Sequence, residues 1–244
     1  VLRQGDAFVV HSEQDRLWLH TLLPHAQVTK ANHPTYADLA QQSQNQPRPP
    51  SDELLPPASD VPTLLFFGFV RPYKGLEYLI QALALVLKQM QVRLLVVGEF
   101  WSSSEFYERY ARQFGVEHAI TFVNRYVPNE ELKFYFDQAN VVVLPYISAT
   151  QSGVVQLAFG FGKPVITTRV GGLHEVVHDG VNGLVVPPQD EEALANAIVR
   201  YFKEQLQERF ESYLATEQGQ SSFSWSVLVK TFEQLHVQLN QPKA

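Results

Sequence analysis

Short apolar runs alternate with amphipathic stretches along most of the chain after residue 62. The apolar runs predict strands at residues 63–68, 92–98, 118–123, 140–145, 163–168 and 184–187. The stretches between them predict helices at residues 76–89, 106–114, 129–138, 154–161 and 191–202. Strands and helices that alternate with short connections favour an α/β fold, in which a parallel sheet carries helices on both faces.

The two ends of the chain depart from this alternation. Near the start, the pattern predicts a strand at residues 7–12 that ends in a helix cap, a helix at 13–23 and a short strand at 28–32. Residues 37–61 are rich in Gln and Pro, a composition that favours a linker. Residues 224–239 have the spacing of a closing amphipathic helix. We therefore divide the chain into a crossing unit (1–36), a linker (37–61), a sheet domain (62–222) and a C-terminal helix (223–244).

The amino-acid composition limits the classes of partner that the protein can bind. The 244 residues include 19 Lys and Arg against 25 Asp and Glu, for a net charge of −6. This balance argues against a nucleic-acid partner, because such binding depends on a broad basic face. The chain has no cysteine, which excludes disulfides and thiolate metal sites. No apolar run has membrane-spanning length, and the start of the sequence does not resemble a signal peptide. We therefore expect a cytoplasmic protein, and this expectation is compatible with peripheral contact with a membrane.

An anion site is predicted after the strand near residue 144. The apolar run 141–144 is followed by small and polar residues, with a helix start at Ser152 or Gly153. The amides at a helix N-terminus carry partial positive charge and suit phosphate, so we expect a nucleotide diphosphate there. Gly68, Gly98 and Pro145 each end an apolar run, and the loops after parallel strands meet at one edge of the sheet. The same residues also fit an ordinary strand and helix of an α/β domain, with glycines in the turns.

Five motifs, in order, add a family resemblance to this interpretation. They lie at residues 66–76, 94–99, 144–155, 162–175 and 179–188. Together they resemble the C-terminal, donor-binding domain of the GT-B glycosyltransferases of family 4, the glycosyl transferases group 1. The resemblance implies a Rossmann-like sheet domain and a two-domain enzyme with its active site in the cleft between the domains. Residues 1–36 resemble the end of the first domain, whose body is absent here. The acceptor domain is therefore expected from a longer protein or from a partner chain.

The resemblance also implies roles for individual residues. Lys74 and Arg71 are expected as the catalytic pair that neutralises the leaving diphosphate, although Phe69 stands where the family usually has its Arg. Arg125 and Tyr126 belong to a loop that the family places against the nucleotide base, with Tyr126 expected to stack and Arg125 to contact a phosphate or the sugar; the segment fits an ordinary exposed loop equally well. The remaining expected donor contacts are Gly68, Thr150, Gln151, Ser152, Gly153 and Val154. Family members generally need no metal or cofactor, and the expected substrate is a UDP- or GDP-linked sugar.

The chain departs from the family at two glutamates. An alignment on residues 162–164 places Ala149 and Leu157 at their positions. Leucine accepts no hydrogen bond, so we expect polar contacts from the turn at residues 150–152, with Gln156 as a further candidate. His33 and His174 are candidate acid–base groups because of their residue type, but their positions favour a turn and a loop over such roles.

Three functions remain open at this point. The leading hypothesis is a retaining, nucleotide-sugar-dependent hexosyltransferase, or its donor-binding half. The alternative is a non-catalytic module that binds a nucleotide sugar and needs a partner acceptor domain. The third is a nucleotide-sugar 2-epimerase, which shares the fold. Such an enzyme needs acid–base groups from both sides of its cleft, and this chain carries only one side.

Overall fold

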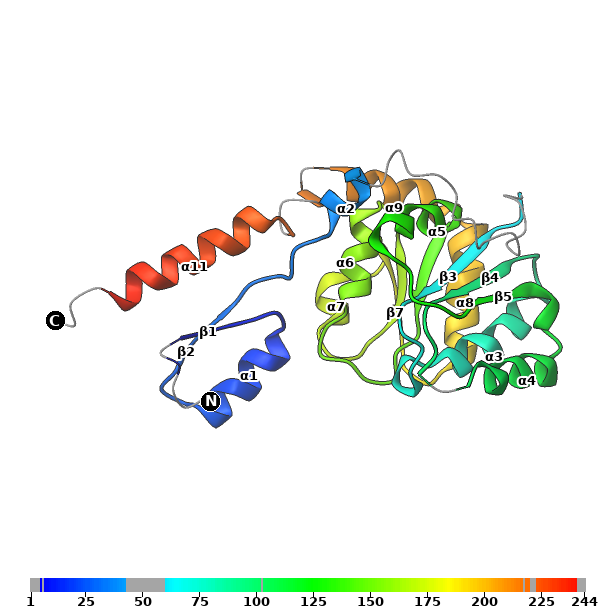
Figure 1. Ribbon diagram of the computed structural model, residues 1–244, viewed down its shortest axis with the longest axis horizontal. Coiled ribbons are helices and arrows are strands. Elements are labelled where there is room, and N and C mark those ends of the chain that lie inside the picture. Colours follow the sequence, from blue (N-terminus) through cyan, green and yellow to red (C-terminus); the bar gives the residue numbers. More distant parts are fainter. Residues whose placement is uncertain are drawn as a thin grey trace.

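A six-stranded parallel sheet forms the centre of the larger part of the protein (Figure 1). The computed structural model describes residues 5, 7–42, 60–101, 103–216, 218–219 and 223–240. The strands are β3 (Thr63–Phe67), β4 (Arg93–Val97), β5 (Ile120–Val123), β6 (Val141–Leu144), β7 (Val165–Thr168) and β8 (Gly183–Val186). Their order is β5-β4-β3-β6-β7-β8, and every neighbouring pair is parallel. The predicted α/β fold is confirmed.

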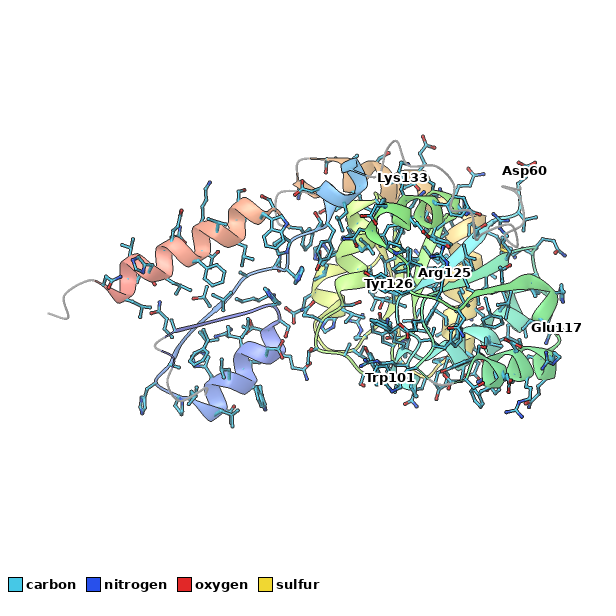
Figure 2. All side chains as sticks on the ribbon, in the orientation of Figure 1. Asp60, Trp101, Glu117, Arg125, Tyr126 and Lys133 are labelled. Carbon is cyan, nitrogen blue, oxygen red and sulfur yellow. The ribbon has the colours of Figure 1, made fainter. Side chains whose placement is uncertain are left out.

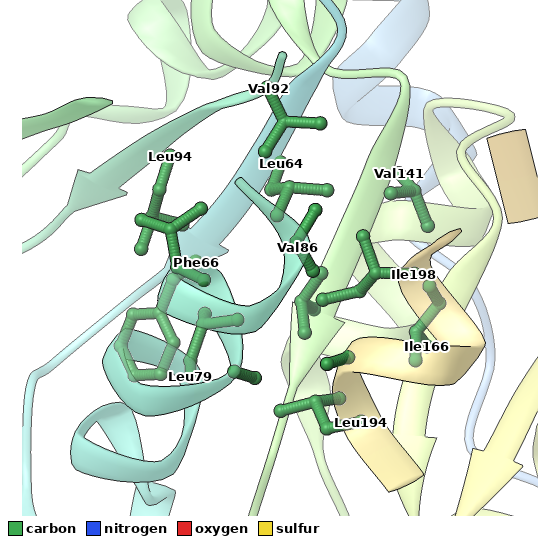
Figure 3. Close-up of a cluster of buried hydrophobic side chains, with 14 of the residues drawn as sticks. Leu64, Phe66, Leu79, Val86, Val92, Leu94, Val141, Ile166, Leu194 and Ile198 are labelled. Carbon is green, nitrogen blue, oxygen red and sulfur yellow. The ribbon is translucent and has the colours of Figure 1, made fainter. Parts of the chain in front are cut away.

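Helices cover both faces of the sheet (Figure 1). They are α3 (Leu76–Val86), α4 (Ser104–Phe114), α5 (Leu132–Gln138), α6 (Gly153–Gly160), α7 (Leu173–Val176), α8 (Glu191–Lys203) and α9 (Leu206–Ala215). Central strand β3 is buried on both faces, as its unbroken apolar run predicts. Leu64 and Phe66 join the hydrophobic cluster beneath α3 and α8 (Figure 3), whereas Leu65 and Phe67 join the one beneath α5 and α6. The two clusters hold the sheet as a rigid support for its loops.

The order of the strands determines where a ligand fits. The chain runs from β3 outward to β5, then returns to β6 and continues outward to β8. Strand order therefore reverses between β3 and β6, and the loops that follow these two strands leave the same edge in diverging directions. Ligands of open α/β sheets bind at such a point.

Two segments differ from the sequence-based expectation. Helix α9 was not predicted, although its buried residues Leu206, Phe210 and Leu214 recur every four positions. Helix α2 (Ala37–Gln42) occupies the start of the predicted linker and contacts α6. The rest of that linker lies largely outside the described residues.

The crossing unit is a small β-α-β element. Strands β1 (Ala7–Val10) and β2 (Gln27–Lys30) pair in parallel, and α1 (Glu13–Leu22) connects them. Helix α11 (Trp225–Leu239) lies beside this unit (Figure 1), where Gln27 donates a hydrogen bond to Gln238. Its apolar residues Trp225 and Phe232 are exposed. Among the described residues, no helix is both long and apolar enough to span a bilayer.

A buried asparagine holds the turn between α7 and β8. Asn182 is 1% exposed; its Oδ1 accepts a hydrogen bond from the His178 amide at 2.8 Å, and its Nδ2 donates to the Val176 carbonyl at 3.1 Å. We expect Asn182→Ala to lower the free energy of unfolding by about 1–3 kcal/mol, because a buried amide and a buried carbonyl lose their partners. Chemical denaturation measures this change, with exposed Asn196→Ala as the control. A loss below about 0.5 kcal/mol would show that the turn does not depend on this side chain.

Candidate functional site

The loop after β3 carries Lys74 on a short 3-10 helix, η3 (Pro72–Lys74). Proline favours the first turn, and Gly75 ends it in the left-handed conformation with φ 68°. A Cβ atom added at Gly75 would lie 2.1 Å from the carbonyl oxygen of Pro145. The turn that presents Lys74 therefore packs directly on the chain that leaves β6.

Lys74 is a buried cation. It is 6% exposed, and its Nζ lies 3.5 Å from the carbonyl oxygen of Phe67 and 5.6 Å from the centre of the Tyr146 ring. Burial, and secondarily the charge of Arg71, lower the pKa of Lys74 to about 8. In the part of the chain that the structure describes, no carboxylate forms an ion pair with Lys74. A cation in this environment is stabilised by an anion that enters from outside.

The first turn of α6 meets Lys74 at Gly68. A Cβ atom added at Gly68 would lie 3.0 Å from Lys74 Nζ and 3.4 Å from Val154 Cγ2, and the φ angle of Gly68 is +90°. The lysine and the helix N-terminus therefore border the same glycine. Helices leave their first amides without intrahelical acceptors, and the side chain of Ser152 does not cap α6. Free amides beside a buried ammonium form an arrangement that suits phosphate oxygens.

Tyr146 connects the two halves of this arrangement, and the sequence analysis missed it. Its Oη lies 3.3 Å from Ser152 Oγ, and burial raises the pKa of its hydroxyl, which therefore stays neutral. Its position directly after the β6 strand and Pro145 was the signal that could have identified it.

Arg71 lies between two exposed aromatic rings. Its guanidinium carbon lies 4.2 Å from the centre of the Trp101 ring and 5.9 Å from that of Phe69. Its Nε atom is buried and has no hydrogen-bond partner among the described residues. Because the charge of Arg71 lowers the pKa of Lys74, the two cations act on the same region. Trp101, 70% exposed and labelled in Figure 2, is a candidate site residue that sequence reasoning missed, although it follows the strand end at Gly98.

Residues 149–152, which we call the donor loop, precede α6. The carbonyl of Thr150 accepts a hydrogen bond from the Gly172 amide at 2.8 Å. The side-chain amide nitrogen of Gln151 donates a hydrogen bond to the carbonyl of His11 at 2.8 Å, and this bond connects the donor loop to the crossing unit. Among the expected donor contacts that follow this loop, Val154 is the one that approaches Gly68 together with Lys74.

The two residues expected beside the base have different environments. Arg125 forms an ion pair with Glu131 and donates to the hydroxyl of Tyr135 at 2.8 Å. These contacts hold its guanidinium against α5 rather than release it for a ligand. Tyr126 is 65% exposed and keeps its ring available for stacking (Figure 2).

The positions of the family glutamates contain no carboxylate, and the structure shows what replaces them. Leu157 is 8% exposed and belongs to the hydrophobic cluster beneath α6. Its neighbour Gln156 is 1% exposed, and its Oε1 has no partner among the described residues. A buried carbonyl oxygen without a partner is uncommon in native proteins. Gln156 is therefore the polar group of α6 with the clearest unused hydrogen-bonding capacity.

The two histidines differ in what surrounds them. The ring of His33 packs against those of His11 and Tyr36 at the crossing between the two parts of the protein. His174 lies within the short helix α7. Neither histidine contacts Lys74 in the described interactions, and no group of three or more His, Asp or Glu residues in the described ranges is arranged to hold a metal ion.

Two cavities lie near the crossing unit, and one of them borders the donor loop. One of about 360 Å³ is lined by β1, α1, Thr150 and Gln151. Another of about 300 Å³ lies at the crossing, between Thr35, Phe159 and Trp225. Lys74 lines neither cavity. The candidate site is therefore defined by the approach of Lys74 and α6 to Gly68.

A protein-family model matches the region that contains this candidate site. The model described as glycosyl transferases group 1 matches residues 61–204, more than half of the chain and all of the elements that carry Lys74 and α6. The chain belongs to the group 1 glycosyltransferases. The family resemblance predicted from the five motifs is confirmed.

Relatives of this glycosyltransferase chain agree on the family. It is 32% identical over 180 residues to a D-inositol 3-phosphate glycosyltransferase of Corynebacterium urealyticum, covering 70% of this chain and 42% of that protein. It is 29% identical over 174 residues to an uncharacterized glycosyltransferase of Methanocaldococcus jannaschii, covering 70% of this chain and 43% of that protein. The chain thus spans about two fifths of the curated relatives that it matches.

Solved glycosyltransferases share the architecture. Sucrose-phosphate synthase from Thermosynechococcus elongatus superposes with a TM-score of 0.78 at 30% identity, covering 98% of this chain and 59% of that one. Anabaena HepE in complex with UDP superposes with a TM-score of 0.75 at 19% identity, covering 96% of this chain and 65% of that one. The second likeness concerns the fold alone.

Proposed function

We propose that this chain is the donor-binding half of a retaining, nucleotide-sugar-dependent hexosyltransferase. The observation that carries the proposal is the approach of Lys74 and the first turn of α6 to the same glycine, Gly68. A diphosphate placed there would meet an ammonium from one loop and backbone amides from another.

The contribution of these groups to the reaction is electrostatic. Negative charge grows on the diphosphate as its bond to the sugar breaks. Lys74, Arg71 and the amides of residues 152–154 stabilise that charge more strongly in the transition state than in the ground state, and such a difference accelerates the step. No part of the proposal needs a metal ion.

Polar groups of α6 and the exposed ring of Tyr126 complete the proposed donor site. Tyr126 stacks on the base. Gln156 supplies a hydrogen-bond acceptor next to the position where the family has its second glutamate. HepE was solved with UDP, and we propose a uridine or guanosine diphosphate sugar as the donor here.

The acceptor site is proposed to come from outside this chain. The described residues contain one large sheet domain and a small crossing unit. In the two curated relatives named above, more than half of the length has no counterpart here. We propose that the missing acceptor contacts belong to a preceding domain or to a partner subunit.

Loss of the two family glutamates favours one alternative, a module that binds a nucleotide sugar without transferring it. Donor hydrolysis distinguishes the two functions. A transferase half should slowly release free sugar from a UDP- or GDP-linked hexose, and Lys74→Met should abolish this release. A binding module should bind the nucleotide without turnover. A thermal-shift panel of UDP, GDP and ADP identifies the base, because a ligand that binds the native state raises the melting temperature. If none of the three raises it, the proposed function is wrong.

The affinity for UDP should depend on pH through Lys74. The free chain has a pKa of about 8 at this lysine, and a bound diphosphate raises that pKa by favouring the charged form. Protonation then accompanies binding, so we expect the affinity to fall roughly eightfold between about pH 7.5 and pH 9, where the phosphates are fully ionised. Isothermal calorimetry at both pH values measures the change. Lys74→Arg stays charged throughout and should show no such fall. A wild-type affinity that is constant over this interval would contradict the role of Lys74.

A further inference from the structure

The carboxylate of Glu175 reaches across the chain to the start of α1. Both of its oxygens accept a hydrogen bond from the amide of Glu13, at 2.9 and 3.0 Å. The same carboxylate forms an ion pair with Lys30 at the end of β2. The two partners lie at the start of α1 and the end of β2, so Glu175 connects two elements of the crossing unit to the sheet domain.

The carboxylate of Glu175 is more buried than the carboxylates of the exposed surface pairs, such as that of Glu204. The side chain of Glu175 is 14% exposed, which reduces its screening by water and salt. An acidic group at a helix N-terminus also interacts favourably with the free amides and the helix dipole. The free carboxylate of an isolated sheet domain would have neither partner.

The donor loop lies against both sides of the same junction. Glycine is required at position 171, because a Cβ atom there would lie 1.8 Å from the carbonyl oxygen of Ala149. A Cβ atom at Gly172 would lie 2.6 Å from Ser12 Cβ, and the Gly172 amide donates to Thr150. Gln151 of the donor loop donates to the His11 carbonyl. The start of α7, the donor loop and the start of α1 are therefore in direct contact.

We propose that Glu175 is a positioning residue that locks the crossing unit against the donor loop and so holds the loop in the shape that receives the diphosphate. The proposal rests on the proposed function of that loop. It implies coupling in both directions: a closed crossing unit favours nucleotide binding, and a bound nucleotide favours the closed unit. Glu175 itself does not touch the diphosphate.

Nucleotide binding by Glu175→Gln tests the proposal. Glutamine keeps the size of the side chain but loses the negative charge that contacts Lys30 and the Glu13 amide. We expect the affinity for UDP, measured by calorimetry on the full chain, to fall between about threefold and tenfold while the unfolding temperature of the sheet domain changes little. Glu204→Gln, which removes the exposed ion pair with Arg200 at the end of α8, is the matched control and should leave the affinity unchanged.

Non-additivity gives a second measurement. Lys30→Met should weaken UDP binding in the same direction, and the double variant Glu175→Gln with Lys30→Met should be little worse than Glu175→Gln alone. Residues that act through one contact show such coupling, whereas independent residues add. Purely additive losses would overturn the role of the ion pair.

Hydrogen exchange tests the contact without any ligand. In the free chain, Glu175→Gln should accelerate exchange at the amides of Glu13 and Gly172 by about tenfold or more, with no change at Phe66 in β3. An unchanged rate at Gly172 would overturn the proposal, because the donor loop would then not sense the crossing unit. An affinity that stays within twofold of the wild-type value would overturn it as well. If wild-type protein binds none of UDP, GDP and ADP, the proposed function fails, and the Gly172 exchange rate still decides whether Glu175 holds the loop.

Discussion

Lys74→Met should bind UDP at least tenfold more weakly than the wild-type chain at pH 7, and it should also be more stable. The affinity falls because the diphosphate loses its buried cation. The stability rises because burial depresses the pKa of Lys74 from 10.5 to about 8. A tenfold change in a protonation equilibrium corresponds to about 1.4 kcal/mol, so the charged lysine costs the folded state up to about 3 kcal/mol at neutral pH.

The sign of this effect can be checked against pH. Between the folded pKa of about 8 and the unfolded value of 10.5, the unfolded chain binds the extra proton. The wild-type free energy of unfolding should therefore gain from this group as pH rises through that window, and Lys74→Met should lack the gain. Lys88→Met, at an exposed position of the sheet domain, is the control for both measurements. A variant that loses UDP binding and stability together would assign Lys74 a structural role instead.

Gly171→Ala should displace the donor loop from its present position. The added Cβ atom would lie 1.8 Å from the carbonyl oxygen of Ala149, and the residue has a φ angle of +49°, where side chains are strained. The neighbouring atom belongs to the backbone, so no side-chain rotation relieves the clash. We expect a loss of about 3 kcal/mol or more in the free energy of unfolding and UDP affinity too weak to measure by calorimetry.

Gly180→Ala is the matched control for this substitution. Gly180 also has a positive φ, +74°, but nothing lies within 4 Å of an added Cβ atom. Its variant should show only the strain of the left-handed conformation, about 1 kcal/mol, with UDP affinity unchanged. If Gly171→Ala matched this control in both measurements, the packing of residues 171 and 149 would not shape the donor loop.

Most of the sheet domain could be predicted from the sequence, for a physical reason. Strands buried on both faces must be apolar throughout, and β3 and β6 have runs that no exposed element would carry. Helix α9 was predictable in principle, because its buried residues recur every four positions among charged ones, as in an amphipathic helix. The positive φ angle of Gln205, which precedes this helix, could not have been predicted from any local pattern.

The approach of Lys74 to α6 follows from topology, since β3 and β6 are neighbours whose loops leave the same edge. That topology does not reveal which side chains are already engaged. Arg125 is held by Glu131 and Gln151 by the His11 carbonyl, and these contacts depend on the packed arrangement rather than on a motif. The contact between Glu175 and Glu13 joins positions 162 residues apart, beyond the reach of any periodicity. The ligand roles of the donor-loop residues, Arg71, Lys74 and Tyr126 stay predictions.

A crystal structure of this chain with UDP tests the central claim most directly. We expect oxygens of the terminal phosphate to lie within hydrogen-bonding distance of Lys74 Nζ and of backbone amides at residues 152–154, next to Gly68. UDP bound elsewhere on the sheet domain, or a Lys74 ammonium that makes no contact with its phosphates, would contradict it.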